Sequence, residues 1–278
     1  MDIRETVQVD DYEAKYAQQQ ALKKLRANLG LFGRTMFPTA IAKAVPPFHH
    51  EIYRNLADEA KKRVLIAAPR GTAKSTVTSL ILPLHRIAFK PSASDLFIVI
   101  VSESQSQSIN FLSRIKYHLI NSQNFKEMFG DYGPETAKRW TNNDIVLANG
   151  SRIIAVGTGQ RVRGFIEGDT RPNLIIVDDY ESELNAATSE ARAKNRKWIT
   201  EAVIPSLSDD GRIVMIGTVI SEDCFLYWAK ESPVWKVLWY SIYDDDGKSI
   251  WEERFPEDRI QSIKQEFAPV GNLNGFYQ

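Results

Sequence analysis

Short runs of consecutive apolar residues alternate along this chain with longer stretches in which apolar residues recur every three or four positions. The apolar runs lie at residues 63–68, 95–102, 173–178 and 212–217. Continuous apolar runs of this length are typical of strands that are buried on both faces of a parallel sheet. Their alternation with helices predicts an α/β fold whose mostly parallel central sheet is flanked by helices.

Helical periodicity fills the intervals between the predicted strands, at residues 74–88, 105–122, 187–204 and 224–230. Another amphipathic helix is predicted at residues 11–29, where Gly30 would end it. One segment departs from this rhythm, because "DIVLANGSRIIAV" places Asn149-Gly150 between two strand-like runs. That dipeptide predicts an antiparallel hairpin, inserted in the sheet or at its edge.

The composition is that of an ordinary globular chain, since 278 residues that are 43% hydrophobic can bury one large core. No apolar run is long enough for a membrane helix and the polar N-terminus is unlike a signal peptide, which favours a cytoplasmic protein without a membrane partner. The single cysteine, Cys224, excludes an intramolecular disulfide. Because 35 Lys and Arg balance 35 Asp and Glu, any contact with nucleic acid must be local or must arise on assembly.

The segment "APRGTAKST", residues 68–76, is the first candidate for chemistry. It departs from the phosphate-loop pattern G-x-x-x-x-G-K-[ST] at Ala68 and Ala73, but it joins a predicted buried strand to a predicted helix, and in that context backbone N–H groups converge on an anion. Lys74 would reach the β- and γ-phosphates, and the Ser75 hydroxyl would bind Mg²⁺. The predicted ATP-binding residues are Pro69, Arg70, Gly71, Thr72, Ala73, Lys74, Ser75 and Thr76.

A second candidate segment, "PNLIIVDDYESE", ends a predicted buried strand in carboxylates. ATP hydrolysis needs one carboxylate near Mg²⁺ and another that orients or deprotonates the attacking water. Asp178, at the strand end, is the predicted metal partner. Asp179 is the predicted water-activating residue, with Glu181 as its alternative. The same acidic residues could instead only cap the next helix.

These two motifs together resemble the ATPase domain of large terminase subunits, the DNA-packaging motors of tailed bacteriophages. "APRGTAKST" is similar to the family's Walker A variant, and "GTGQRVRGFIEGDTRPNLIIVDDYE" is similar to its Arg-Gly segment followed by the Walker B strand. "GRIVMIGTVISEDCF" is similar to its coupling motif, and the resemblance extends from "PPFHHEIYRNL" to "NLNGFYQ". It implies a P-loop NTPase fold of the ASCE type with a small helical lid subdomain.

The resemblance also implies roles for particular residues. Arg70 would lie near the phosphates, and Arg163 would be an arginine finger that can act on a neighbouring subunit, with Arg161 as its rival. Gly217 and Thr218 would form the coupling element. Phe48 and His49 match the segment that contacts adenine, although the glutamine common there is missing, and a packing role at the start of the nearby helix is the alternative.

For the whole chain, the resemblance implies an N-terminal helical segment of the lid at residues 1–60, an ATPase core at 61–233 and a C-terminal lid or linker at 234–278. The linker would lead to a nuclease domain outside this chain, so no nuclease activity is expected. ATP hydrolysis with Mg²⁺ would drive double-stranded DNA into a procapsid in the host cytoplasm. The implied partners are double-stranded DNA, neighbouring copies in a homo-oligomeric ring that is pentameric by family resemblance, a portal protein and a small terminase subunit. A helicase-like ATPase and a nucleotide-binding subunit without turnover are the alternatives.

Overall fold

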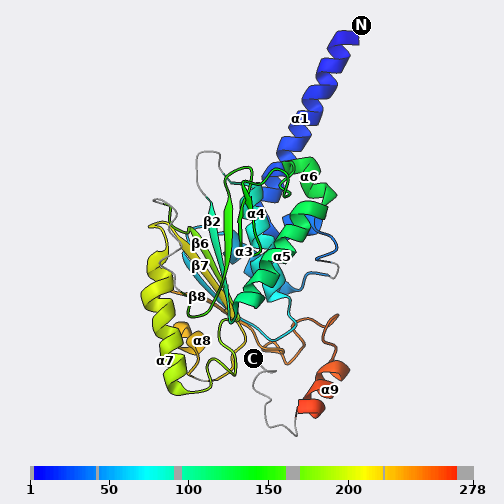
Figure 1. The fold of residues 1–278 in the computed structure, drawn as a ribbon. Coiled ribbons are helices and arrows are strands. Elements are labelled where there is room, and N and C mark those ends of the chain that lie inside the picture. The colour runs from blue at the N-terminus through cyan, green and yellow to red at the C-terminus, as the bar shows by residue number, and fades with distance from the viewer. Residues whose placement is uncertain (1–2, 42–43, 91–95, 161–169, 222, 268–278) are drawn as a thin grey trace.

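The computed structural model describes residues 3–41, 44–90, 96–160, 170–221 and 223–267 (Figure 1). Within these ranges the strands form an eight-stranded sheet with the order β3-β4-β5-β2-β6-β7-β1-β8. The strands are β1 (Arg63–Ala67), β2 (Phe97–Ser102), β3 (Arg139–Trp140), β4 (Asp144–Val146), β5 (Arg152–Gly157), β6 (Leu174–Asp178), β7 (Arg212–Gly217) and β8 (Lys236–Trp239).

In the sheet, the neighbouring strands β5, β2, β6, β7, β1 and β8 pair in parallel. The pairs β3–β4 and β4–β5 are antiparallel. Every residue of β2, β6 and β7 is buried. Burial on both faces explains why these strands are continuous apolar runs in the sequence. The predicted mostly parallel α/β sheet is therefore confirmed.

Helices cover both faces of the sheet (Figure 1). Alternate residues of β1 belong to separate apolar clusters, with Val64 and Ile66 on the face of α2 to α6 and Leu65 on the face of α7 and α8. The α-helices are α1 (Ile3–Ala27), α2 (Leu29–Met36), α3 (Pro47–Ala57), α4 (Leu82–Ala88), α5 (Gln105–Asn121), α6 (Gln123–Phe129), α7 (Ser189–Trp198), α8 (Phe225–Lys230) and α9 (Glu257–Phe267). Shorter π and 3-10 segments are η1 (Thr76–Ile81), η3 (Ile199–Val203) and η4 (Ile204–Ser206).

The N-terminal helix differs from its prediction. Helix α1 begins at Ile3 and projects away from the sheet, and a new helix begins directly after Asn28 (Figure 1). The Asn28 side chain accepts a hydrogen bond from the Leu31 backbone N–H at 2.9 Å, which is a helix N-cap. Gly30 therefore does not end a helix. A Cβ atom there would lie 2.8 Å from the Tyr53 ring, so the glycine allows α2 and α3 to approach closely.

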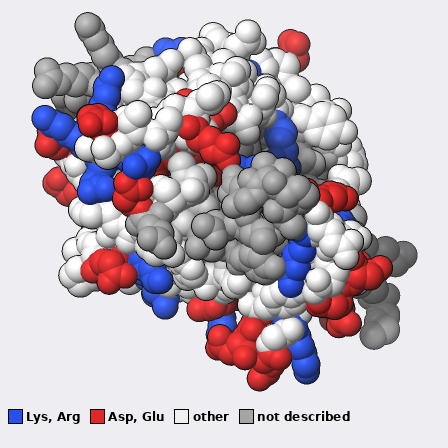
Figure 2. All heavy atoms as spheres, turned by 90° about the horizontal axis from the view of Figure 1, so that it is seen from below, with Lys and Arg blue, Asp and Glu red and all other residues white. Residues whose placement is uncertain are grey.

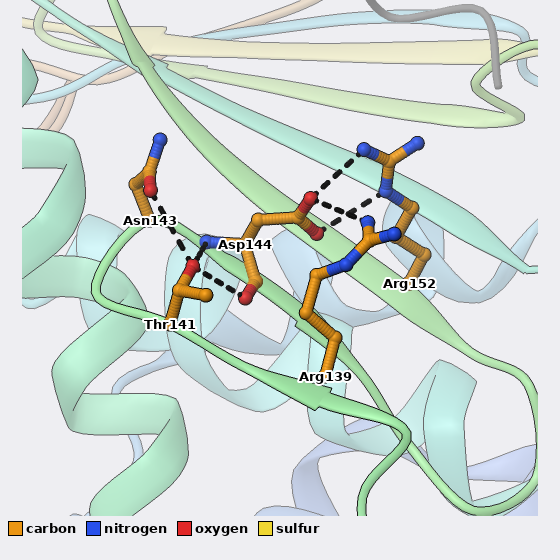
Figure 3. Close-up of polar contacts among 5 residues, drawn as sticks. All are labelled: Arg139, Thr141, Asn143, Asp144 and Arg152. Atoms are coloured by element: carbon orange, nitrogen blue, oxygen red, sulfur yellow. Dashed lines mark hydrogen bonds and ion pairs between the residues drawn. The ribbon is translucent and has the colours of Figure 1, made fainter.

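The predicted hairpin forms at the edge of the sheet, where β4 pairs with β5. Gly150 has a φ of +81° in its turn, which glycine adopts without strain. The Asp144 carboxylate accepts hydrogen bonds from Arg139 Nη1 at 2.7 Å and from Arg152 Nη2 at 2.9 Å (Figure 3). One carboxylate on β4 thus holds arginines from the strands on either side of it.

The C-terminal part of the chain returns to the sheet. Strand β8 pairs with β1, so the sheet extends beyond residue 233, and the division of the chain into domains at residues 60 and 233 stays a prediction. Trp251 and Phe255, which follow β8, are buried in the same apolar cluster as α2 to α6. In the described part of the chain, none of the helices combines the length and apolarity needed to cross a membrane.

Candidate nucleotide-binding site

The loop at residues 68–75 leaves β1 at the carboxyl edge of the sheet and enters η1. Two of its residues have a left-handed backbone, Gly71 with a φ of +79° and Ala73 with a φ of +60°. Ala68 instead continues the strand pairing, because its N–H donates to the Gly217 carbonyl at 3.3 Å. Of the two alanines that replace glycines, only Ala73 therefore carries backbone strain, which costs on the order of 1–2 kcal/mol.

Hydrogen bonds hold this loop in shape. The Thr72 hydroxyl donates to the Pro69 carbonyl at 2.7 Å. His49, on α3, donates from Nε2 to the Thr72 carbonyl, also at 2.7 Å. Burial lowers the pKa of His49 to about 4, so the ring is neutral near pH 7. With Nε2 as the donor, the other ring nitrogen carries no proton. Phe48 packs against the Tyr240 ring, with the ring centroids 5.2 Å apart.

The loop is joined to the end of β7 by Lys74. This lysine is only 5% exposed, and its Nζ donates to Thr218 Oγ1 at 2.9 Å. Gly217 precedes Thr218 at the end of β7, where a Cβ atom would lie 3.0 Å from Leu226 Cδ1. The predicted coupling residues thus lie directly beside the predicted phosphate-binding lysine.

Asp178, the last residue of β6, is fully buried and faces the helix that follows the loop. Its carboxylate accepts hydrogen bonds from Ser75 Oγ at 3.0 Å and from Ser79 Oγ at 2.5 Å. Burial, followed by the charge of Asp179, raises the pKa of Asp178 to about 7. A buried carboxylate beside a hydroxyl supplies the hard oxygen ligands that suit Mg²⁺, so Ser75 and Asp178 fit this ion.

The two candidate carboxylates for water activation have different surroundings. Asp179 has a φ of +46°, and its Oδ1 accepts from the Thr218 backbone N–H at 3.1 Å. Glu181 accepts from the Phe225 N–H, at the start of α8, at 2.8 Å. Burial raises the pKa of Glu181 above its ordinary value. The strained backbone of Asp179 is held by bonds from β7, because its own N–H donates to the Ile216 carbonyl at 3.0 Å.

All of these segments border one cavity of about 670 Å³. Loop residues Arg70, Gly71, Lys74, Ser75 and Thr76 line it together with Asp179, Glu181 and Thr218. Its remaining lining is largely apolar or aromatic and includes Ile41, Val45, His49, Tyr53 and Trp251. A lining that combines charged groups with apolar and aromatic side chains suits a nucleotide, which has a charged phosphate part and an aromatic base.

Three residues at this site, Ser79, Trp251 and Arg254, were not predicted from the sequence. Ser79 lies four residues after Ser75 on the same helical face, a spacing that could have revealed it. Trp251 and Arg254 reach the cavity from the segment after β8, and no local pattern signals this. The predicted arginine finger Arg163 and its rival Arg161 lie outside the described residues.

A buried strand, a loop of this shape and a buried aspartate in this arrangement are typical of the P-loop NTPase fold, and the fold is similar to that of solved structures. The large terminase ATPase domain of Thermus phage P74-26 is similar with a TM-score of 0.56 and 14% identity, over 86% of this chain and 95% of that one. A mutant of that domain gives a TM-score of 0.57.

The large terminase of bacteriophage HK97 is similar with a TM-score of 0.55 and 12% identity, over 84% of this chain and 50% of that one. This chain thus spans about half the length of the HK97 protein. No protein-family model matches the sequence, and no curated protein matches it. The chain has the fold of large terminase ATPase domains, which confirms the predicted fold class.

Proposed function

We propose that this chain binds ATP and Mg²⁺ in the cavity at the carboxyl edge of the sheet and hydrolyses ATP. One observation carries the proposal: three segments distant in the sequence meet there through functional side chains. Ser75 and Asp178 are 103 positions apart and share a hydrogen bond, and Lys74 and Thr218 are 144 positions apart and share another. A phosphate-binding loop with these partners is the arrangement that ATP hydrolysis needs.

The loop would bind the phosphates through its backbone N–H groups and the charge of Lys74. Ser75 and Asp178 are the residues that would hold Mg²⁺, and Ser79 orients the Asp178 carboxylate. When bound, the ion neutralises negative charge on the phosphate oxygens. Arg70 borders the same cavity from the exposed side of the loop and adds positive charge there.

Asp179 is our candidate for activating the attacking water. Its carboxylate borders the cavity, and the Thr218 N–H fixes one of its oxygens while the other can accept from water. Glu181 is held by the start of α8, so we assign it to positioning that helix. Its own position at the cavity keeps it as the alternative, and separate substitutions distinguish the two.

Gly217 and Thr218 are our candidates for coupling hydrolysis to motion. Thr218 contacts Lys74 through its hydroxyl and Asp179 through its backbone N–H. Any change in the position of Lys74 on phosphate release would therefore reach the end of β7. Contacts that differ between two nucleotide states are what a conformational change requires.

We further infer that hydrolysis powers the movement of double-stranded viral DNA into a procapsid, as in a large terminase. The similarity to two terminase structures over more than four-fifths of this chain supports this. The proposed partners are DNA, neighbouring copies in a pentameric ring, a portal protein and a small terminase subunit, in the host cytoplasm. Arg163, or its rival Arg161, would act as the arginine finger.

The charge distribution is compatible with such a ring. Figure 2 shows the face at the carboxyl ends of the strands, where basic and acidic side chains are interspersed. With 35 basic and 35 acidic residues in the chain, DNA would be held by a few basic side chains from each subunit.

Phosphate release and binding of a fluorescent ATP analogue would be measured for wild type, Lys74→Ala and Lys62→Ala. Lys62 is the matched control, because it does not border this cavity. Its Nζ instead forms an ion pair with Asp210, at a distance of 3.7 Å. We expect Lys74→Ala to lose both activities and Lys62→Ala to keep them. Unchanged binding and turnover in Lys74→Ala would refute the proposal. Stimulation by double-stranded DNA without strand separation favours a packaging motor over a helicase.

A further inference from the structure

A short segment after β8, residues 251–255, packs directly against the phosphate loop. A Cβ atom on Gly71, in the middle of the loop, would lie 3.2 Å from Phe255 Cζ and 3.9 Å from Arg254 Nε. Gly71 is thus the point at which the loop touches this segment. The guanidinium group of Arg254 therefore lies beside the middle of the loop, whose backbone N–H groups would bind the phosphates under the proposed function.

Aromatic rings hold Arg254 in this place. Its guanidinium carbon lies 5.4 Å from the centroid of the Trp251 ring and 5.9 Å from that of the Phe255 ring. The Trp251 ring in turn packs edge-on against His49, with centroids 5.1 Å apart. Stacking on rings restricts the long side chain without neutralising its charge.

Two hydrogen bonds fix the segment as well. The Glu253 carboxylate accepts a hydrogen bond from the Ala44 N–H at 3.2 Å, and the Arg254 N–H donates to the Trp251 carbonyl at 3.0 Å. The segment is therefore tied to the chain before α3 as well as to the loop. Such a preorganised cation can bind an anion without first losing much conformational freedom.

The charge of Arg254 is available to a ligand. In the described ranges of the chain no carboxylate lies within ion-pair distance of its guanidinium, and its Nε has no hydrogen-bond partner. The residue nevertheless borders the same cavity as Lys74 and Thr218. An unpaired guanidinium in a confined site favours phosphate, whose oxygens match its planar fork.

We propose that Arg254 binds the β- and γ-phosphates of the nucleotide from within the same chain. The inference rests on the proposed function, and it adds a phosphate ligand that comes from the C-terminal segment rather than from the loop. A fixed guanidinium there stabilises charge on the transferring phosphoryl group. The same contact would make the position of residues 251–255 depend on which phosphates are bound.

The test compares Arg254→Gln, Arg254→Lys and the control Arg259→Gln. Arg259 lies 5.5 Å from the same Phe255 ring but is exposed and does not border the cavity. We expect Arg254→Gln to lower the turnover number roughly 10²-fold and Arg254→Lys to lower it less, with Arg259→Gln unchanged. Affinity for ATP should fall relative to affinity for AMP, which lacks both distal phosphates.

A purely structural role would lower AMP and ATP affinity alike and would be visible as a lower melting temperature. That result, or wild-type turnover in both Arg254 variants, overturns the inference. If Arg254→Gln does not fold, the ATP-to-AMP affinity ratio of Arg254→Lys decides. Different results would refute the proposed function. Wild type would then fail to bind ATP, or Lys74→Ala would leave ATP binding unchanged, and neither result depends on the Arg254 variants.

Discussion

Lys74 Nζ lies 2.9 Å from Thr218 Oγ1, so one hydrogen bond joins the phosphate loop to the end of β7. Both side chains are at least nine-tenths buried, and the bond gives the ammonium group an acceptor within the protein. A bound phosphate would attract the same ammonium group, which has three N–H donors, and would shift its position relative to Thr218. The relationship therefore links the binding of phosphate to the strand that we assign to coupling.

Replacing the two loop alanines by glycine should change the free energy of unfolding in opposite directions. Ala73→Gly should raise the free energy of unfolding by up to about 1 kcal/mol, because glycine relieves the left-handed backbone that gives Ala73 a φ of +60°. Ala68→Gly is the matched control and should lower it by about 1 kcal/mol, since it removes a buried methyl group and gives the unfolded chain more backbone freedom. Urea unfolding measures both. Equal effects of the same sign would contradict this account.

The two serines that bond to Asp178 should differ in their effect on Mg²⁺-dependent ATP binding. Ser75→Ala should abolish the increase in ATP affinity that Mg²⁺ gives, because it removes a predicted metal ligand. Ser79→Ala should keep that increase but destabilise the fold by about 1–2 kcal/mol, since it removes a hydrogen bond to the buried Asp178 carboxylate. Calorimetric titration with and without Mg²⁺ tests this. Loss of the Mg²⁺ effect in Ser79→Ala alone would show that the metal assignment is wrong.

Asp179→Asn should bind ATP but release phosphate roughly 10²-fold or more slowly, because an amide cannot accept a proton from water. Asparagine tolerates the left-handed backbone and can still accept from the Thr218 N–H, so the fold should persist. Glu181→Gln keeps an acceptor for the Phe225 N–H and should stay within about tenfold of wild type. Single-turnover phosphate release measures the rates. The opposite ranking would move the catalytic role to Glu181.

Stability should fall as the pH is lowered through the range set by His85. Burial, and then the charge of Arg86, lowers the pKa of His85 from 6.5 to about 4. Between these values the unfolded chain binds a proton that the folded chain excludes, so protonation favours unfolding by on the order of 2 kcal/mol at pH 4.5.

The matched variant is His85→Gln, which does not titrate and can still donate to the Arg26 carbonyl that His85 Nε2 contacts at 3.1 Å. Its free energy of unfolding should depend less steeply on pH between 6.5 and 4.5 than that of wild type. Identical slopes in the two proteins would rule out His85 as the cause.

Local patterns predicted much of the fold and pointed to the loop and strand ends that form the candidate site. Each buried strand is a continuous apolar run, and Lys74 and Ser75 follow one of them at fixed spacing, so both can be found within a few residues. Asp178 was predictable for the same reason, as the polar residue that ends β6. The hairpin was predictable because Asn149-Gly150 is a local turn signal.

Features that depend on contacts between distant segments were not predictable. Strand β8 is short and only half buried, so its sequence lacks the long apolar run of an internal strand. The helix boundary at Asn28 follows from a capping bond, while the close contact of Gly30 with Tyr53 is tertiary. Arg254 reaches the loop from a part of the chain with no motif of its own.

A crystal structure of the chain with Mg²⁺ and a non-hydrolysable ATP analogue would show whether the cavity is a nucleotide site. We expect phosphate in the cavity, with Lys74 Nζ bonded to the β- and γ-phosphate oxygens, and Mg²⁺ beside Ser75 and Asp178. The distance from Lys74 Nζ to Thr218 Oγ1 should then exceed its present 2.9 Å. An analogue bound elsewhere, or a cavity that stays empty at saturating analogue while Lys74 keeps its bond to Thr218, would contradict it.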